Sequence, residues 1–143
     1  MLFIGLVEDS MISFASVNWL AILLGTVVSM ALGALWYGPL FGQLWLTLIG
    51  KTEDELESNP VMYIKTAVAA MIGMLALNLV VVSFGATDIL SGLLAGGFIF
   101  LGLGATTTFV YTNFEGPSEK VWFLYVAYHL VVYLIMGVVF AIW

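Results

Sequence analysis

The sequence lacks cysteine and has few charged side chains. Of 143 residues, 3 are Lys or Arg and 9 are Asp or Glu, which makes 8% charged. A soluble domain usually has about a quarter of its residues charged. The scarcity of charge excludes a soluble or disordered chain, the absence of cysteine excludes a disulfide scaffold, and a net charge of −6 disfavours a nucleic-acid binder. With a mean hydropathy of +1.15, the chain is expected to be a single-domain integral membrane protein.

Four long apolar runs predict an all-α, polytopic membrane protein with a four-transmembrane-helix bundle. Each run has about the 20 residues that a helix needs to cross a bilayer. The runs are apolar on all sides and too long for barrel strands, so helices are expected. Asn59-Pro60 and Thr87-Asp88 supply the caps expected before the second and third helices. The predicted spans are residues 17–36, 62–84, 89–111 and 121–142, within one domain of residues 1–143.

The aromatic and basic residues predict how the chain sits in the membrane. All five tryptophans fall near span ends or in the adjoining loop, as an aromatic belt does. Lys51, Lys65 and Lys120 lie in or beside the two longer loops, which share one side. The positive-inside rule then places those loops in the cytoplasm and both termini outside. Residues 1–16 show no signal-peptide pattern and are expected to form a short interfacial segment.

The loop after the first span contains the densest motif. Gly38-Pro39 is expected to break the first helix near Tyr37, because proline lacks a backbone donor and restricts the residue before it. Apolar residues then recur at helical spacing, which predicts a short interfacial helix at about residues 40–50. Farther on, Thr52 and Glu55 have the spacing of a capping box.

This motif carries a family resemblance. The string from Ala34 to Gly42, with Trp45 and a preceding Asn18-Trp19, resembles the bacterial membrane family catalogued as domain of unknown function 1761. The resemblance extends to the four-span layout and implies a protein of the bacterial inner membrane with no assigned activity. The residues that carry the resemblance are Asn18, Trp36, Tyr37, Gly38, Pro39, Phe41, Gly42 and Trp45.

Small residues at four-residue spacing indicate where helices approach closely, because helices in lipid associate through packing rather than hydrophobicity. Such stripes are compatible with contacts between protomers or with ordinary packing inside one bundle. Since a four-span chain has a thin core, a homo-oligomer is expected. The candidate packing residues are Gly25, Ser29, Gly33, Gly73, Gly92, Gly96 and Gly104.

A few uncharged polar residues lie inside the predicted spans, where a polar group must be paired or face a wet cavity. His129 is the only histidine, and Tyr125 and Tyr133 lie four residues before and after it, a spacing that places the three on one helix face. The favoured interpretation is hydrogen bonding between helices. A polar pathway or ligand pocket and an axial haem ligand are alternatives. The candidate residues are Asn78, Thr106, Thr107, Thr108, Tyr125, His129 and Tyr133.

The functional expectation rests largely on the reactive residue types that the chain lacks. The chain has no cysteine, one histidine and no acid within a span, so neither an enzyme, a dedicated metal site nor a bound cofactor is predicted. The favoured function is an accessory or structural membrane protein that associates with itself or with another membrane protein. The alternatives are a homo-oligomeric channel or carrier for a small neutral solute, and a binder of a lipid or an apolar cofactor.

Overall fold

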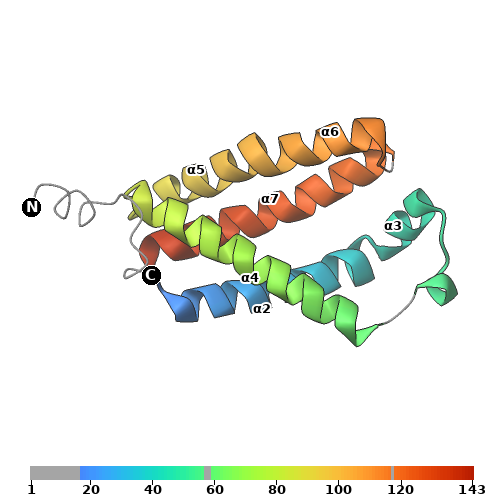
Figure 1. Ribbon diagram of the computed structural model, residues 1–143, viewed down its shortest axis with the longest axis horizontal. Helices are drawn as coiled ribbons and strands as arrows, with labels where there is room; N and C mark the ends of the chain where they lie inside the picture. The colour runs from blue at the N-terminus through green and yellow to red at the C-terminus, as the bar shows by residue number, and fades with distance from the viewer. Residues whose placement is uncertain (1–16, 57–58, 117) are drawn as a thin grey trace, which may run out of the picture.

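The computed structural model describes residues 17–56, 59–116 and 118–143. These residues form helices and turns (Figure 1), and four of the helices are long and apolar enough to span a membrane. The prediction of an all-α, four-span protein is confirmed. The expected interfacial segment of residues 1–16 lies outside the described residues. The four spans are Trp19–Leu40, Pro60–Ser83, Ile89–Phe114 and Glu119–Ile142.

The third span is interrupted by a wider, π-helical turn, and the first span ends in a kinked segment. The first consists of α2 (Trp19–Leu35) and the kinked segment η2 (Trp36–Leu40). The third consists of α5 (Ile89–Ile99), the π-helical turn η4 (Phe100–Ala105) and α6 (Thr106–Phe114). The second and fourth spans, α4 (Pro60–Ser83) and α7 (Glu119–Ile142), are continuous α-helices. Between the first two spans lie the short helix α3 (Gly42–Ile49) and the 3-10 turn η3 (Glu53–Glu55).

Side-chain caps fix several helix starts, as the sequence predicts. The Asn59 side chain accepts a hydrogen bond from Val61 N, and Pro60 occupies the first turn of α4. Asp88 accepts from Ser91 N at 2.8 Å and caps α5. The predicted capping box is also present, since Thr52 N donates to the Glu55 carboxylate at 2.8 Å. Each cap satisfies backbone donors that have no partner within the helix.

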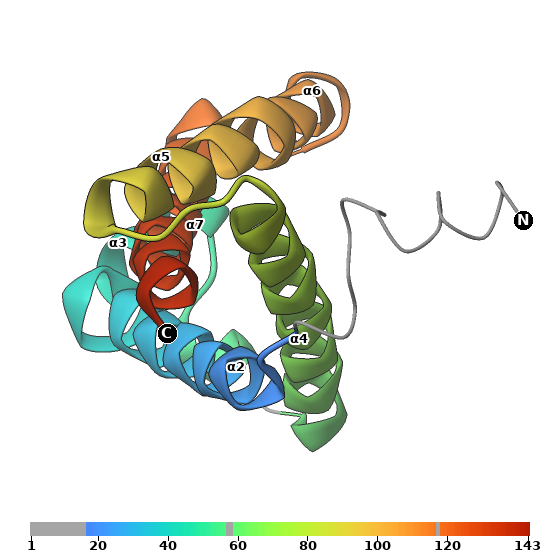
Figure 2. The ribbon, with the colours of Figure 1, turned by 90° about the vertical axis from the view of Figure 1, so that its left-hand side faces the viewer.

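α7 packs against the other three spans. α2 and α4 pair on one side of it, and the α5–α6 span crosses on the other (Figures 1 and 2). Ile22, Leu77, Val81 and Met136 are fully buried at the centre of this arrangement. The start of α2 and the end of α7 lie at the same end of the bundle as the α4–α5 turn, and α3 and the α6–α7 turn lie at the other (Figure 1).

Glycine brings α5 into backbone contact with α7. A Cβ added to Gly92 would lie 2.6 Å from the carbonyl oxygen of Gly137, and one added to Gly96 would lie closer still to the carbonyl oxygen of Tyr133. Gly137 is the only glycine of the fourth span and faces Gly92 and Gly96. The Gly92–Gly96 stripe therefore meets another helix of the same chain, where a larger residue would push the two backbones apart.

The small residues of the first span also face neighbouring helices. A Cβ on Gly25 would lie 2.7 Å from Met136 Cε, and one on Gly33 would lie 3.2 Å from the Tyr128 hydroxyl. Ser29, between them, is buried, and its hydroxyl donates to the Thr26 carbonyl. This stripe positions α2 against α4 and α7.

The outward-facing surface of the spans is apolar over most of its extent. Every residue from Pro60 to Thr66, the first two turns of α4, is exposed. From the α4–α5 turn, α4 and the α5–α6 span diverge toward the opposite end (Figure 1). Side chains as large as Phe98, Leu103 and Val27 lie on the exterior. Such a surface suits acyl chains rather than water.

Candidate functional site

The family-like motif forms a sharp kink at the end of the first span. Gly38 leaves helical geometry, with φ −105° and ψ −109°, directly before Pro39. The helix break predicted at Gly38-Pro39 is therefore confirmed. Phe41 N donates to Trp36 O at 2.9 Å, and a Cβ on Gly42 would lie 2.8 Å from the carbonyl oxygen of Tyr37. Glycine at 42 thus allows the chain to turn tightly into α3.

The kink delivers Tyr37 into a cluster of aromatic rings from three elements. Its ring centre lies 5.4 Å from that of Trp45 in α3, and 6.0 and 5.5 Å from those of Tyr125 and Tyr128 in α7. All three contacts are edge-on, the geometry that aromatic quadrupoles favour. Trp45 Nε1 also donates to the Tyr125 hydroxyl at 3.4 Å. The Trp36 ring centre lies 6.2 Å from that of Tyr128. We name Trp36, Tyr37, Trp45, Tyr125 and Tyr128 the aromatic cluster.

Tyr128 ties this cluster to the middle of α2. Its hydroxyl donates to the backbone oxygen of Ser29 at 2.7 Å. The glycine at position 33 leaves room for this hydroxyl to reach α2. A hydrogen bond between helices has no competing water in the hydrocarbon region, so this contact fixes the register of α2 against α7.

His129 lies beside the aromatic cluster on the outer surface of α7. Its Nδ1 is 2.9 Å from the backbone oxygen of Tyr125, and since a carbonyl only accepts, Nδ1 donates there. The imidazole stacks on Phe100, with ring centres 5.9 Å apart and planes 14° apart. The residue is nevertheless exposed, and no described residue donates to or accepts from Nε2. A neutral imidazole in this state presents an acceptor to whatever covers the surface.

The residues of the predicted Tyr125–His129–Tyr133 stripe have different neighbours. Tyr125 contacts the motif side through Trp45, and His129 and Tyr133 both contact the Phe100 ring, at 5.9 and 5.2 Å. The Tyr133 hydroxyl lies 3.6 Å from where a Cβ on Gly73 of α4 would be. Gly104 leaves room for the Phe100 ring, which its Cβ would approach to 2.7 Å.

The three threonines of α6 are exposed, and two of their hydroxyls donate to backbone oxygens of the preceding turn, η4. Thr106 Oγ1 donates to the Gly102 carbonyl at 2.7 Å, and Thr108 Oγ1 donates to the Gly104 carbonyl at 2.9 Å. Thr108 also accepts from Trp122 Nε1 at 3.1 Å. Thr107 is exposed as well. Thr106 and Thr108 thus satisfy their donors locally.

Two buried polar atoms have no hydrogen-bond partner among the described residues. One is Oδ1 of Asn78, whose side chain is 2% exposed on α4, and the other is Nε1 of Trp36 in the aromatic cluster. Asn78 does not join the aromatic cluster or His129 through any described contact. An unpaired buried amide oxygen lowers stability, since a buried polar atom without a partner loses its hydration with no replacement.

The acidic loop closes back on α3. Gln43 Nε2 donates to the Glu53 carboxylate at 3.0 Å. Hydrogen bonds from the backbone and side chain of Thr52 lower the pKa of Glu55 below its ordinary value. The loop is therefore anionic and tied by local bonds. The helix predicted at residues 40–50 is present as α3, and its position in the interface stays a prediction.

Comparison with known proteins assigns the chain to a family. The family described as protein of unknown function (DUF1761) matches residues 20–141. The chain belongs to the DUF1761 family. No curated protein and no solved structure matches it.

The DUF1761 match covers the four spans except for their outermost residues, Trp19 and Ile142, and it includes the kink motif and the aromatic cluster. Asn18 lies just before the matched residues, and its side chain caps α2 by accepting from Ala21 N at 3.0 Å. The remaining motif residues lie within the match, and Trp36 also packs on Phe41 with ring centres 4.6 Å apart. In this DUF1761 protein, the motif residues from Trp36 to Trp45 build the kink and join it to α7.

Sequence reasoning missed two members of the site. Tyr128, a polar residue of the fourth span that lies off the predicted Tyr125–His129–Tyr133 stripe, provides the bond between helices. Phe100 supports both His129 and Tyr133, and nothing in an apolar run distinguishes it from neighbouring phenylalanines. Gly104, four residues after it, was the available signal, since a glycine near a large ring indicates room for that ring.

Proposed function

We propose that this DUF1761 protein is a non-catalytic accessory protein of the bacterial inner membrane that acts by packing against a second membrane protein surface, in the first instance its own copy. Both termini are placed outside the cytoplasm, following the lysine distribution. The observation that carries the proposal is the exposure of His129. The proposal assigns no reaction, since the sequence offers one histidine, no cysteine and no acid within a span.

The depth of His129 makes its exposure significant. It lies near the middle of α7, about 15 Å along the helix axis from Glu119. Acyl chains supply no hydrogen-bond donor for Nε2, and polar residues at this depth normally face protein or a wet cavity. A second protein surface that offers a hydroxyl or amide would satisfy the imidazole. The monomer is therefore the less favourable state in a bilayer.

Energy transfer between labelled copies in proteoliposomes tests the proposal at a series of lipid-to-protein ratios. We expect association of the wild type and weaker association of His129→Phe, which keeps the stack on Phe100 but removes the polar atoms. Loss of one hydrogen bond between helices corresponds to about threefold weaker association. His129→Asn retains a donor and an acceptor and should restore part of the affinity.

Two results would contradict this function. One is a wild-type protein that stays monomeric at high protein density and retains no membrane partner after mild solubilisation. The other is equal association of the wild type and His129→Phe, which would show that the imidazole plays no part in the contact.

A homo-oligomeric channel for a small neutral solute is the second candidate, favoured by the same exposed imidazole if it faces the axis of an oligomer. It predicts solute flux through wild-type proteoliposomes that changes in His129→Ala. Association without flux supports the accessory function and excludes the channel.

A further inference from the structure

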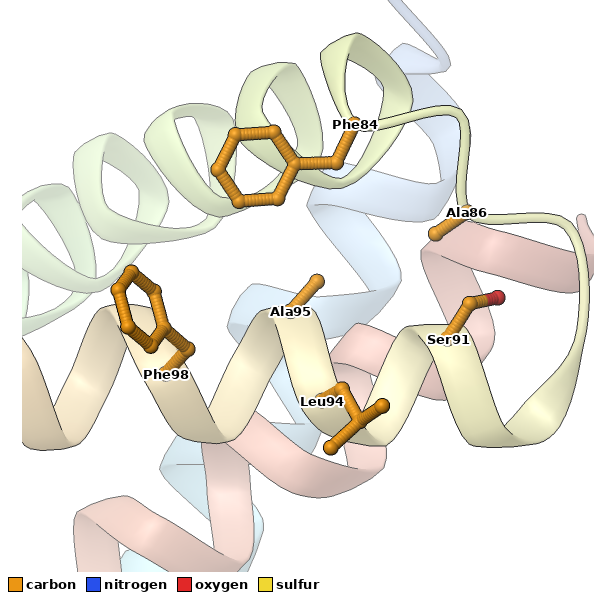
Figure 3. A pocket seen from close by; sticks show the side chains of 6 residues that line it. All are labelled: Phe84, Ala86, Ser91, Leu94, Ala95 and Phe98. Carbon is orange, nitrogen blue, oxygen red and sulfur yellow. The ribbon is translucent and has the colours of Figure 1, made fainter.

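The α4–α5 turn encloses one side of an open apolar groove. Its volume is about 340 Å³, within the range of small-ligand sites. Figure 3 shows the Phe84 ring extending from the end of α4 over α5, with Phe98 and Ser91 at the two ends of the lining face of α5. The lining residues are Phe84, Ala86, Ser91, Leu94, Ala95 and Phe98.

The groove follows from how α5 is held. Gly92 and Gly96 fix one face of α5 to α7, which leaves the face of Ser91, Leu94, Ala95 and Phe98 directed toward the end of α4. These four residues have the spacing of one helix face. α4 diverges from α5 beyond the turn (Figure 1), and Phe84 and Ala86 are the residues at the end of α4 and in the turn that line the groove. The small Ala86 and Ala95 side chains keep it open.

The groove has a carboxylate beside it. Asp88 Oδ1 accepts from Ser91 N at 2.8 Å and from Ser91 Oγ at 3.0 Å, so the charge lies one hydrogen bond from a lining residue. These bonds also lower the pKa of Asp88, so the carboxylate, ionised at neutral pH, resists protonation in mild acid as well. No lysine or arginine occurs between Lys65 and Lys120, so no cation near the turn in sequence balances it.

We propose that this groove binds one acyl chain of a phospholipid whose headgroup carries an ammonium, such as phosphatidylethanolamine. The apolar lining accepts the chain, and the Asp88 carboxylate attracts the ammonium. A phospholipid with a net anionic headgroup gains the same chain contacts and meets the carboxylate with like charge. The groove thus selects the headgroup by charge complementarity at its polar end.

Native mass spectrometry of the full-length protein in mild detergent tests this inference. Phosphatidylethanolamine and phosphatidylglycerol with identical acyl chains are titrated in parallel, and the fraction of protein carrying one lipid is measured. We expect saturable binding of one phosphatidylethanolamine and about threefold weaker binding of phosphatidylglycerol, as for one exposed charge pair.

Two leucines of α5 provide a matched pair of variants. Leu94 lines the groove and is 64% exposed, whereas Leu90 is 66% exposed and does not line it. Leu94→Ala should weaken binding of both lipids about fivefold, and Leu90→Ala should leave it unchanged. Because both side chains are exposed, neither truncation should unfold the protein.

Asp88→Asn distinguishes the contribution of the headgroup to binding from that of the acyl chain, because asparagine also caps helices but carries no charge. We expect this variant to bind both lipids equally. Equal loss in Leu94→Ala and Leu90→Ala would overturn the groove as the site. Equal binding of the two lipids by the wild type, or a preference unchanged in Asp88→Asn, would overturn the headgroup assignment. A peptide found bound in the groove in place of a lipid would overturn the assignment of a phospholipid as its occupant. None of these results depends on self-association through His129.

Discussion

α5 and the first two turns of α4 both belong to membrane-spanning helices, yet they have opposite surroundings. α5 approaches α7 until Gly92 and Gly96 meet backbone atoms, whereas every residue from Pro60 to Thr66 is exposed. The start of α4 includes Lys65 and Thr66, but apolar character alone does not decide which segment packs closely, because lipid is as apolar as a leucine side chain. The difference lies in side-chain size at the contact face. Glycine lets α5 gain close packing over its length, and the bulky start of α4 offers no such contact.

The largest expected effect comes from within α4, where the two halves of one helix differ. Leu77 is fully buried, whereas Ile64 is 62% exposed. Leu77→Ala should lower the free energy of unfolding by about 3 kcal/mol, because it leaves a cavity between α4 and its neighbours. Ile64→Ala should change it by less than about 0.5 kcal/mol. Reversible unfolding in mixed micelles measures both.

Similar losses for the two variants would mean that the start of α4 packs as firmly as its second half. That result would identify a contact for residues Pro60–Thr66 beyond the single chain and would erase the contrast with α5.

The sequence sufficed for the four spans, because about 20 apolar residues between polar turns leave few alternatives in a bilayer. It also located the break at Gly38-Pro39 and the cap at Asp88, since both depend on local chemistry. It did not reveal the π-helical turn η4, which lies in a run where apolar and glycine residues are also compatible with a regular helix.

The partners of the candidate site were harder to predict, because they depend on how helices are oriented in three dimensions. Residues four apart on a helix differ by about 40° in direction, so Tyr125 and Tyr133 differ by about 80°. They therefore reach different neighbours: Tyr125 meets Trp45, and Tyr133 meets Phe100. The pairing of Gly92 and Gly96 with Gly137 likewise required knowing which helix lies beside α5.

A smaller loss should follow from adding a single methyl group to α5. Gly96→Ala places a Cβ against the backbone of Tyr133 and should lower the free energy of unfolding by about 2 kcal/mol, the usual cost of overpacking. Gly102→Ala is the control, since a Cβ there meets nothing within 4 Å. It should be neutral or slightly stabilising, because alanine favours helix more than glycine does. The same unfolding assay applies.

If Gly96→Ala were as stable as Gly102→Ala, α5 would not depend on backbone contact with α7. The contrast between α5 and the start of α4 would then need an explanation other than side-chain size.

The smallest effect concerns the turn that joins the two regions compared above. Hydrogen bonds from the backbone and side chain of Ser91 lower the pKa of Asp88 below its ordinary value of 3.8. A carboxyl whose folded-state pKa is lowered stabilises the fold above that ordinary value and loses this contribution as pH falls through the lowered pKa. Between about pH 5 and 8 the carboxyl of Asp88 stays ionised, so its contribution to thermal stability should not change with pH. Below about pH 4 that contribution should decline. Asp88→Asn supplies an uncharged cap, so the difference in melting temperature between wild type and variant should shrink on acidification. A difference that stays constant down to pH 3, about one unit below the ordinary value, would show that the charge of Asp88 does not stabilise the start of α5.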